Sequence, residues 1–279
     1  MDRPVGVVGG GTMGLGVAQS LATAGHPVVV LDPADQVRAT GSDRLRDGLR
    51  LAKLLGRFSG DHAEVLSSVR WTAVEKDLDD VQFVVECGPE RIPLKQELFR
   101  MLDAVCPPDA VLASCTSAIP IGLLAACTGR PELVLGMHFM NPAPLKPVVE
   151  VARTEQTGAD TLRRADELLA GMGKRGIVVR DAPGFVSNRV LMSTINDAAT
   201  VVQEGTADPA TVDKVFEDCF GHRMGPLRTA DLIGLDTILD TLHVLLETTG
   251  DDRFTPCELL VGMVREGRLG KKSGGGFFR

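Results

Sequence analysis

The sequence between residues 111 and 151 contains polar side chains that suit acid–base chemistry at an alcohol. One apolar run ends at residues 114–117 (Ser-Cys-Thr-Ser), a second ends at His138, and Glu150 follows twelve residues later in another apolar run. A histidine changes charge near pH ~6.5, so one at a strand end beside a hydroxyl and a carboxylate can accept a substrate proton. We therefore expect proton transfer at an alcohol.

The N-terminal residues form a glycine-rich segment of the kind that binds a dinucleotide. The apolar run 5–8 leads directly into Gly-Gly-Gly-Thr-Met-Gly at 9–14, and apolar residues then recur at helical spacing. Such glycines permit a tight turn and let the backbone approach a pyrophosphate, whose charge the helix N-terminus stabilises. We expect cofactor contacts from Gly9, Gly11, Thr12, Met13 and Gly14.

A carboxylate follows the second predicted strand. The apolar run 28–31 ends at Asp32, about 20 residues after the glycines, where an acid can hold the ribose 2′-hydroxyl. The charge of Asp32 disfavours a 2′-phosphate, so NAD is expected rather than NADP. The alternative is a glycine-rich turn with an incidental aspartate, but the complete order of strand, loop, helix, strand and acid argues against it.

The first part of the chain alternates short apolar runs with helical stretches, which predicts an α/β fold with a mostly parallel, doubly wound sheet of the Rossmann type. A Pro-Gly pair at 183–184 marks a boundary, after which strand patterns vanish. We expect a dinucleotide-binding domain over 1–183 and a smaller all-helical domain over 184–279. The strand-like runs are 4–8, 27–31, 81–85, 110–113, 132–138, 147–151 and 176–179.

Asn188 is a polar residue on the apolar stripe of a helix predicted over 185–203. A buried amide requires hydrogen-bond partners. Asn188 either ties down the linker or points into the cleft between the domains, and we favour the cleft. Further on, Asp208 followed by Pro209 is a good helix start, and more helices are expected over 231–248 and 257–266.

Composition excludes several classes of protein. A length of 279 residues favours two domains, and the net charge of −7, without a lysine- or arginine-rich block, argues against a nucleic-acid partner. No apolar stretch approaches the ~20 residues of a membrane span, so we expect a cytoplasmic protein. The six cysteines show no CxxC pair and are interpreted as reduced thiols. No metal site is expected.

A helical segment after Asp32 has an apolar face, formed by Leu45, Leu49, Ala52 and Leu55, and many basic residues around the rest. We interpret the basic residues as an ordinary solvated face. The functional alternative is a binding surface for a phosphorylated carrier, with Arg44, Arg46, Arg50, Lys53 and Arg57 as candidates.

The chain resembles the 3-hydroxyacyl-CoA dehydrogenase family over essentially its whole length. The motifs that match follow the family's order along the chain. They are the glycine segment 9–14, Asp32, 86–90 (Glu-Cys-Gly-Pro-Glu) with Lys95, 114–117, 138–142 (His-Phe-Met-Asn-Pro) with Glu150, 182–189, 224–227, 233–236 and 270–277.

The resemblance implies roles for individual residues. His138 corresponds to the family's general base and Glu150 to the carboxylate that orients it, while Ser117 and Asn188 correspond to groups that bind the 3-oxygen of the substrate. His138 would take the hydroxyl proton while C3 delivers hydride to the nicotinamide. A satisfied core histidine would not need all three partners.

Other positions match cofactor contacts or depart from the family pattern. Glu90 and Lys95 match cofactor-contacting positions, and Asn141 lies where the family keeps an active-site asparagine. Cys115 replaces an asparagine that is usual in the family, and a thiol cannot reproduce the hydrogen bonds of an amide. The lysine before Glu150, Lys146, is shifted by one residue.

Three functions remain open at this point. The leading one is NAD-dependent interconversion of a 3-hydroxyacyl-CoA, such as 3-hydroxybutyryl-CoA, with its 3-oxoacyl thioester. The second is oxidation of a small hydroxyacyl group, such as glyceryl, on an acyl carrier protein in polyketide extender-unit synthesis. The third is a non-catalytic NAD-binding or crystallin-like structural protein. The resemblance also implies a homodimer, formed through a helical domain that binds substrate.

Overall fold

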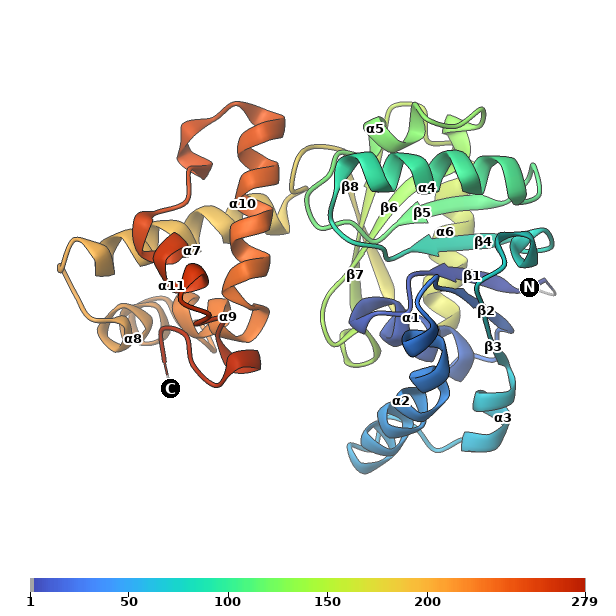
Figure 1. Cartoon of the computed structure of the whole chain (residues 1–279), viewed down its shortest axis with the longest axis horizontal. Coiled ribbons are helices and arrows are strands. Elements are labelled where there is room, and N and C mark those ends of the chain that lie inside the picture. Colours follow the sequence, from blue (N-terminus) through green and yellow to red (C-terminus); the bar gives the residue numbers. More distant parts are fainter. Residues whose placement is uncertain (1–2, 279) are drawn as a thin grey trace. The chain divides into compact units, whose positions relative to one another are not determined.

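The computed structural model describes residues 3–278, which form two compact units (Figure 1). The first unit contains the chain up to Thr116 and the segment Pro120–Ala182. The second contains Ser117–Ile119 and the chain from Pro183 onward. The short segment after residue 116 therefore packs with the second unit, although it follows a strand of the first.

The first unit is built on one eight-stranded sheet with the order β3-β2-β1-β4-β5-β6-β7-β8. All neighbouring strands are parallel except β6 and β7, which are antiparallel. This confirms the mostly parallel sheet. The strands are β1 Val5–Val8, β2 Val28–Leu31, β3 Val69–Thr72, β4 Phe83–Glu86, β5 Val111–Ser114, β6 Val134–Phe139, β7 Val148–Arg153 and β8 Arg175–Arg180.

The sequence analysis missed β3. This segment reads Val-Arg-Trp-Thr, with Val69 and Thr72 buried but Arg70 exposed between them, and β3 pairs only with β2, at the edge of the sheet. An edge strand with one solvated face has no continuous apolar run, so the hydrophobic pattern of four residues is too weak to detect.

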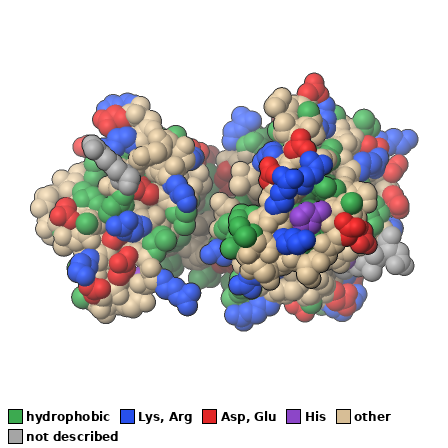
Figure 2. Space-filling view, turned by 90° about the horizontal axis from the view of Figure 1, so that it is seen from below, with side chains coloured by type: hydrophobic (Ala, Val, Ile, Leu, Met, Phe, Trp, Pro, Cys, Tyr) green, Lys and Arg blue, Asp and Glu red, His purple; other side chains and the backbone are tan. Residues whose placement is uncertain are grey.

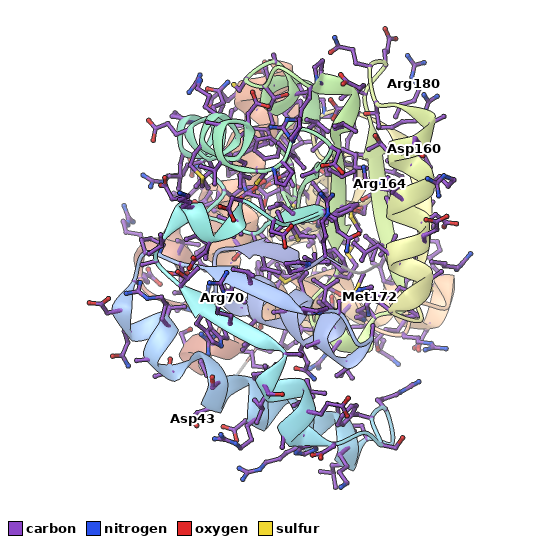
Figure 3. All side chains as sticks on the ribbon, turned by 90° about the vertical axis from the view of Figure 1, so that its right-hand side faces the viewer. Asp43, Arg70, Asp160, Arg164, Met172 and Arg180 are labelled. Atoms are coloured by element: carbon purple, nitrogen blue, oxygen red, sulfur yellow. The ribbon has the colours of Figure 1, made fainter. Side chains whose placement is uncertain are left out.

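Helices cover both faces of the sheet (Figures 1 and 3), which confirms the doubly wound fold. On one face, buried residues of α1, α2 and α6 share a core with alternate strand residues such as Val7, Val30 and Val85. On the other face lie α4 and α5, whose Phe99 and Leu124 are fully buried. The helices are α1 Thr12–Thr23, α2 Asp35–Leu54, α3 His62–Ser67, α4 Ile92–Val105, α5 Ile121–Ala125 and α6 Ala159–Gly171.

The basic helical segment predicted after Asp32 is α2. Leu45, Leu49 and Ala52 are buried as expected. Leu55 was wrongly placed on the buried face, because α2 ends at Leu54 and Leu55 is 50% exposed at the helix C-cap. Asp43, which lies on α2, is labelled in the lower part of Figure 3.

The second unit is all-helical, as predicted. Asp208 is the N-cap of α8 and accepts a hydrogen bond from the Thr211 N–H. The helix expected over 231–248 is divided by Gly234, whose φ of 108° few other residues adopt. The helices are α7 Ser187–Gln203, α8 Pro209–Phe220, α9 Pro226–Ile233, α10 Leu235–Thr249 and α11 Glu258–Arg265.

Asp231 anchors the glycine-rich motif near the C-terminus of the second unit. Its two carboxylate oxygens accept hydrogen bonds from the N–H groups of Phe277 and Phe278, at 2.9 and 2.8 Å. A Cβ on Gly276 would lie 1.9 Å from Asp231 Oδ1. This motif therefore has a structural role, because the carboxylate needs a glycine there.

Short 3₁₀ turns complete the two units. They are η1 Glu75–Leu78, η2 Pro131–Leu133, η3 Ala143–Leu145, η4 Asp252–Phe254 and η5 Lys271–Ser273. None of the helices within residues 3–278 is long and apolar enough to cross a membrane. In the space-filling view, basic and acidic side chains are interspersed on the face shown (Figure 2).

Candidate active site

The glycine segment joins β1 to α1 with the close contacts that the motif requires. Gly9 has a φ of 95°, and a Cβ on Gly14 would lie 1.7 Å from the Gly9 carbonyl oxygen, so both positions demand glycine. A Cβ on Gly11, by contrast, would have nothing within 4 Å. The space above Gly11, at the N-terminus of α1, fits the diphosphate of a dinucleotide.

Asp32 lies at the carboxyl end of β2 and is bound to the same segment. Its Oδ2 accepts the Gly10 N–H at 2.7 Å, and its Oδ1 accepts the Ala34 N–H at 2.9 Å. Each carboxylate oxygen keeps a lone pair with which it can accept a ribose hydroxyl. The geometry fits the adenosine half of NAD.

Two arginines of α2 also lie at this end of the sheet, and the sequence analysis assigned neither to the cofactor. Arg38 donates to the Asp32 carbonyl oxygen at 2.6 Å, and Arg44 donates to the Gly10 carbonyl oxygen at 3.1 Å. The sequence could have indicated both arginines by their positions, about one and three turns into the helix that follows Asp32. They hold the two loops that contain Gly10, after β1, and Asp32, after β2.

We expect Asp32→Ala to reduce the preference for NAD over NADP. Charge repulsion by Asp32 and its hydrogen bond to the ribose each contribute about 1–3 kcal/mol, so the ratio of kcat/KM values should fall by at least about tenfold. The measurement is steady-state kinetics with both cofactors, with the exposed Asp43→Ala variant on α2 as control. An unchanged ratio in Asp32→Ala would remove this role from Asp32.

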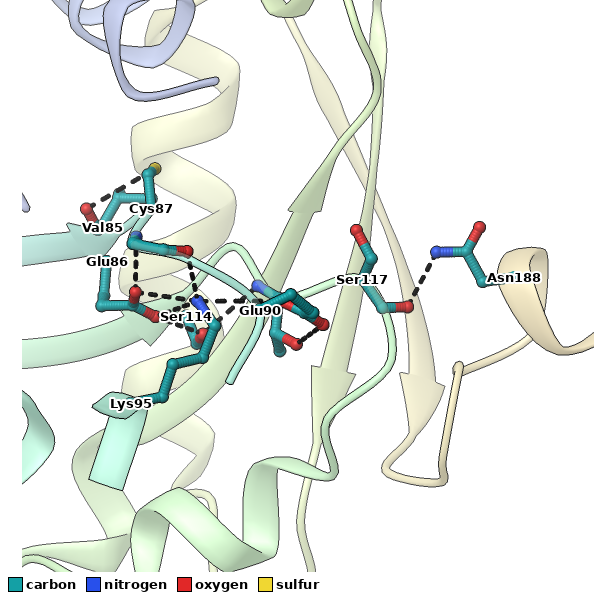
Figure 4. Close-up of polar contacts among 10 residues, drawn as sticks. Val85, Glu86, Cys87, Glu90, Lys95, Ser114, Ser117 and Asn188 are labelled. Atoms are coloured by element: carbon teal, nitrogen blue, oxygen red, sulfur yellow. Dashed lines mark hydrogen bonds and ion pairs between the residues drawn. The ribbon is translucent and has the colours of Figure 1, made fainter. Parts of the chain in front are cut away.

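A buried ion pair lies at the carboxyl ends of β4 and β5 (Figure 4). Lys95 of α4 is 1% exposed, and its Nζ lies 2.8 and 2.9 Å from the two carboxylate oxygens of Glu86, which is fully buried. The third donor of Lys95 binds the Gly88 carbonyl oxygen at 3.0 Å, and Ser114 Oγ donates to Glu86 at 2.7 Å. Sequence reasoning gave Glu86 no role, although it begins the matching motif 86–90.

Glu90 joins this cluster from the other side. Its Oε2 lies 3.8 Å from Lys95 Nζ, and its Oε1 accepts the hydroxyl of Thr116. Burial lowers the pKa of Lys95, but the Glu86 and Glu90 carboxylates more than offset it, so the pKa is raised and Lys95 is charged. The donors of Lys95 point to protein groups, and a cofactor contact by Lys95 or Glu90 stays a prediction.

His138 and Glu150 form the pair that the sequence suggested. The antiparallel register of β6 and β7 places them directly opposite each other, and His138 Nδ1 lies 3.2 Å from Glu150 Oε2. Both residues are buried. A carboxylate at Nδ1 holds the imidazole in one tautomer and stabilises its protonated form, so Nε2 is the nitrogen suited to take up a proton.

Asn188 and Ser117 meet in the second unit. Asn188, the second residue of α7, donates from Nδ2 to the Ser117 carbonyl oxygen at 2.8 Å (Figure 4). The buried amide thus binds the serine backbone. Asn141 lies exposed in the turn that follows β6 of the first unit.

Comparison with protein families identifies both units. Residues 4–182 match the model of the 3-hydroxyacyl-CoA dehydrogenase NAD binding domain, and residues 184–279 match the C-terminal domain of the same family. Together, the glycine segment, Asp32 and the first match show that NAD is the cofactor. Among the described residues, no group of three or more His, Cys, Asp or Glu is placed to hold a metal ion.

Individual relatives agree with the family models. A probable 3-hydroxybutyryl-CoA dehydrogenase of Deinococcus radiodurans is 42% identical and covers 98% of this chain and 99% of its own. The crystal structure of M. tuberculosis FadB2 is 40% identical, with a TM-score of 0.94 over 99% of this chain and 98% of its own. That of (S)-3-hydroxybutyryl-CoA dehydrogenase from Ralstonia eutropha is 36% identical, with a TM-score of 0.90 and the same coverage.

These relatives favour interconversion of a 3-hydroxyacyl-CoA with its 3-oxoacyl thioester over a carrier-protein substrate or a non-catalytic role. The chain belongs to the 3-hydroxyacyl-CoA dehydrogenase family, NAD-dependent enzymes that interconvert 3-hydroxyacyl and 3-oxoacyl thioesters.

Proposed function

We propose that this enzyme acts on a short 3-hydroxyacyl-CoA, with 3-hydroxybutyryl-CoA as the model substrate. The observation that carries the proposal is the His138–Glu150 pair, in which a buried imidazole faces a buried carboxylate across adjacent strands. A base of this kind suits the removal of a hydroxyl proton at neutral pH. The names of the relatives support the short acyl chain.

In the proposed mechanism, His138 Nε2 takes the proton of the 3-hydroxyl group. Glu150 holds Nδ1 and stabilises the imidazolium that forms, and His138 returns the proton when the reaction runs toward the alcohol. Ser117 and Asn188 bind the 3-oxygen, and the amide of Asn188 also donates to the Ser117 backbone carbonyl oxygen. NAD, when bound, supplies the acceptor for the hydride of C3.

The acyl carrier is tested by turnover of matched substrates. We expect NADH formation from 3-hydroxybutyryl-CoA, followed by nicotinamide absorbance, and much less from the same acyl group on an acyl carrier protein at equal concentration. The opposite result, with an inert CoA thioester and a rapidly oxidised carrier-bound group, would exclude CoA as the natural carrier. An enzyme that reduced NAD with neither substrate would refute the proposed acyl group.

The basic residues of α2 differ in their availability for CoA phosphates. Arg46 and Arg50 form ion pairs with Asp43 and Asp47, three residues earlier on the helix. Lys53 and Arg57, at and beyond the end of α2, are exposed. Among the described residues, neither has an acidic partner. We therefore favour Lys53 and Arg57 as CoA contacts.

Neutralising both residues, in Lys53→Ser/Arg57→Ser, should raise KM for 3-hydroxybutyryl-CoA about tenfold with little change in kcat, as expected for uniform binding energy. The effect should weaken at high salt, because exposed charges are screened over about 10 Å at 0.1 M. The matched control is Arg46→Ser/Arg50→Ser, which removes the same charge from the same helix. Equal KM changes in both variants would show a general charge effect instead of a binding site.

We further propose that the enzyme is a homodimer formed through its helical unit. That unit exposes large apolar side chains, including Val190, Phe220 and Leu232, and such side chains are typical of association surfaces when they are contiguous.

A further inference from the structure

Cys87 and Cys115 continue two neighbouring strands of the sheet. Glu86 and Ser114 are the last paired residues of β4 and β5, and each cysteine follows directly. The N–H of Cys115 donates to the Glu86 carbonyl oxygen at 2.7 Å, which is the parallel-sheet bond that places Cys115 opposite Cys87. Neighbouring strands lie about 4.8 Å apart, within the Cα separation of about 4.4–6.8 Å that a disulfide spans.

The two thiols also lie on the same face of the sheet. Side chains alternate along a strand, and Val85, Cys87, Ala113 and Cys115 all belong to the core beneath α1. Glu86 and Ser114 occupy the alternate positions and therefore point to the α4 face, where Glu86 contacts both Lys95 and Ser114. The Cys87 Sγ lies 3.8 Å from the Val85 carbonyl oxygen, and the two thiols are close enough for each to shift the pKa of the other.

This thiol pair borders the cofactor loop. A Cβ on Gly9 would lie 2.9 Å from the Cys87 carbonyl oxygen, and a Cβ on Gly14 would lie 3.4 Å from the Cys87 Cβ. Cys87 is partly exposed, and Cys115 is buried beside it. A small oxidant that enters the cofactor site therefore approaches the pair from the side of Cys87.

The surroundings make the two thiols unequal. The interaction with the neighbouring Cys87 thiol lowers the pKa of Cys115, against the effect of burial, and the charges of His138 and Lys95 and the Phe139 N–H lower it further. The pKa of Cys87 is raised well above its usual value by the same interaction with Cys115, by burial and by the Glu86 carboxylate. Cys115 is thus the better nucleophile, since the thiolate is the reactive form.

We propose that Cys87 and Cys115 are a modification site, a dithiol that hydrogen peroxide converts reversibly to a disulfide. The sulfur of Cys115 attacks one peroxide oxygen, the O–O bond breaks, and one water leaves as Cys115 becomes a sulfenic acid. The sulfur of Cys87 then attacks that of Cys115, the S–O bond breaks, and the displaced hydroxyl leaves with the Cys87 proton as a second water. Two thiols lose two electrons, and the peroxide gains them.

The test uses the full-length enzyme and does not depend on its substrate. The protein is treated with hydrogen peroxide, its remaining thiols are alkylated after unfolding, and its peptides are examined by mass spectrometry with and without dithiothreitol. We expect a peptide in which Cys87 and Cys115 are cross-linked and which dithiothreitol separates. Cys106 serves as an internal reference, because burial raises its pKa to about 12 and it should remain a thiol.

Two single variants test the order of the steps. Cys87→Ser should leave a sulfenic acid on Cys115, trapped by dimedone, whereas Cys115→Ser should slow the oxidation of Cys87 by about tenfold or more. The exposed Cys219→Ser variant is the matched control and should form the same cross-link as wild type. The proposal is overturned if peroxide oxidises Cys219 while Cys87 and Cys115 both stay alkylatable, or if Cys115 passes to a sulfinic acid without any cross-link. Unchanged oxidation of Cys87 in Cys115→Ser would overturn the assigned order.

Discussion

Replacement of His138 by glutamine should lower kcat for hydroxyacyl oxidation by about 10²–10⁴ while NAD binding survives. Glutamine keeps much of the side-chain volume and can still contact Glu150, but it cannot accept the substrate proton at neutral pH. The glycine segment and Asp32 lie on other strands and are not altered. The measurement is single-turnover NADH formation, so that the chemical step is observed.

Binding of the cofactor can be followed separately in the same variant. Trp71 is the only tryptophan of the chain, and its ring lies 2.9 Å from where a Cβ on Gly10 would be. Its fluorescence should therefore report NADH binding. Glu150→Gln should also slow turnover, because the imidazolium loses its carboxylate partner. A His138→Gln enzyme with near-normal single turnover would show that His138 is not the base.

Loss of Lys95 should strongly destabilise the first unit. Lys95→Met would leave the carboxylate of Glu86 buried without its cation, and removal of one partner from a buried ion pair costs about 3–5 kcal/mol in the free energy of unfolding. The measurement is urea unfolding at neutral pH.

The raised pKa of Lys95 determines how the stability contributed by the ion pair changes at alkaline pH. In wild type the ion pair contributes fully below the ordinary lysine pKa, and its contribution is lost only as the pH rises through the higher folded-state value. Lys214→Met is the matched control, since Lys214 is exposed and its pair with Asp218 on α8 is solvated, so its loss should change the unfolding midpoint little. Equal unfolding midpoints for the two variants would contradict a stabilising role for Lys95. The double variant Glu86→Gln/Lys95→Met should recover part of the loss.

Features carried by short, continuous segments could be predicted from the sequence. The strand, glycine loop and helix at the N-terminus, Asp32 after β2 and the N-cap at Asp208 each depend on residues within a few positions of one another. Apolar periodicity then gave the α/β class and the helical second part. The sequence also suggested the His138–Glu150 pair, through the spacing of twelve residues between two apolar runs and through the family resemblance.

The register between distant strands was decided only by the tertiary structure. Nothing local pairs Glu86 with Ser114, 28 residues away, or shows that Lys95 directs its donors to Glu86. For the same reason Cys87 and Cys115 appear in the sequence as isolated thiols. The sequence by itself determined the fold class and the family, and it predicted candidate catalytic groups. Only the folded sheet decided which of those groups touch, because contacts between strands depend on hydrogen-bond register and on side-chain parity, which no single segment encodes.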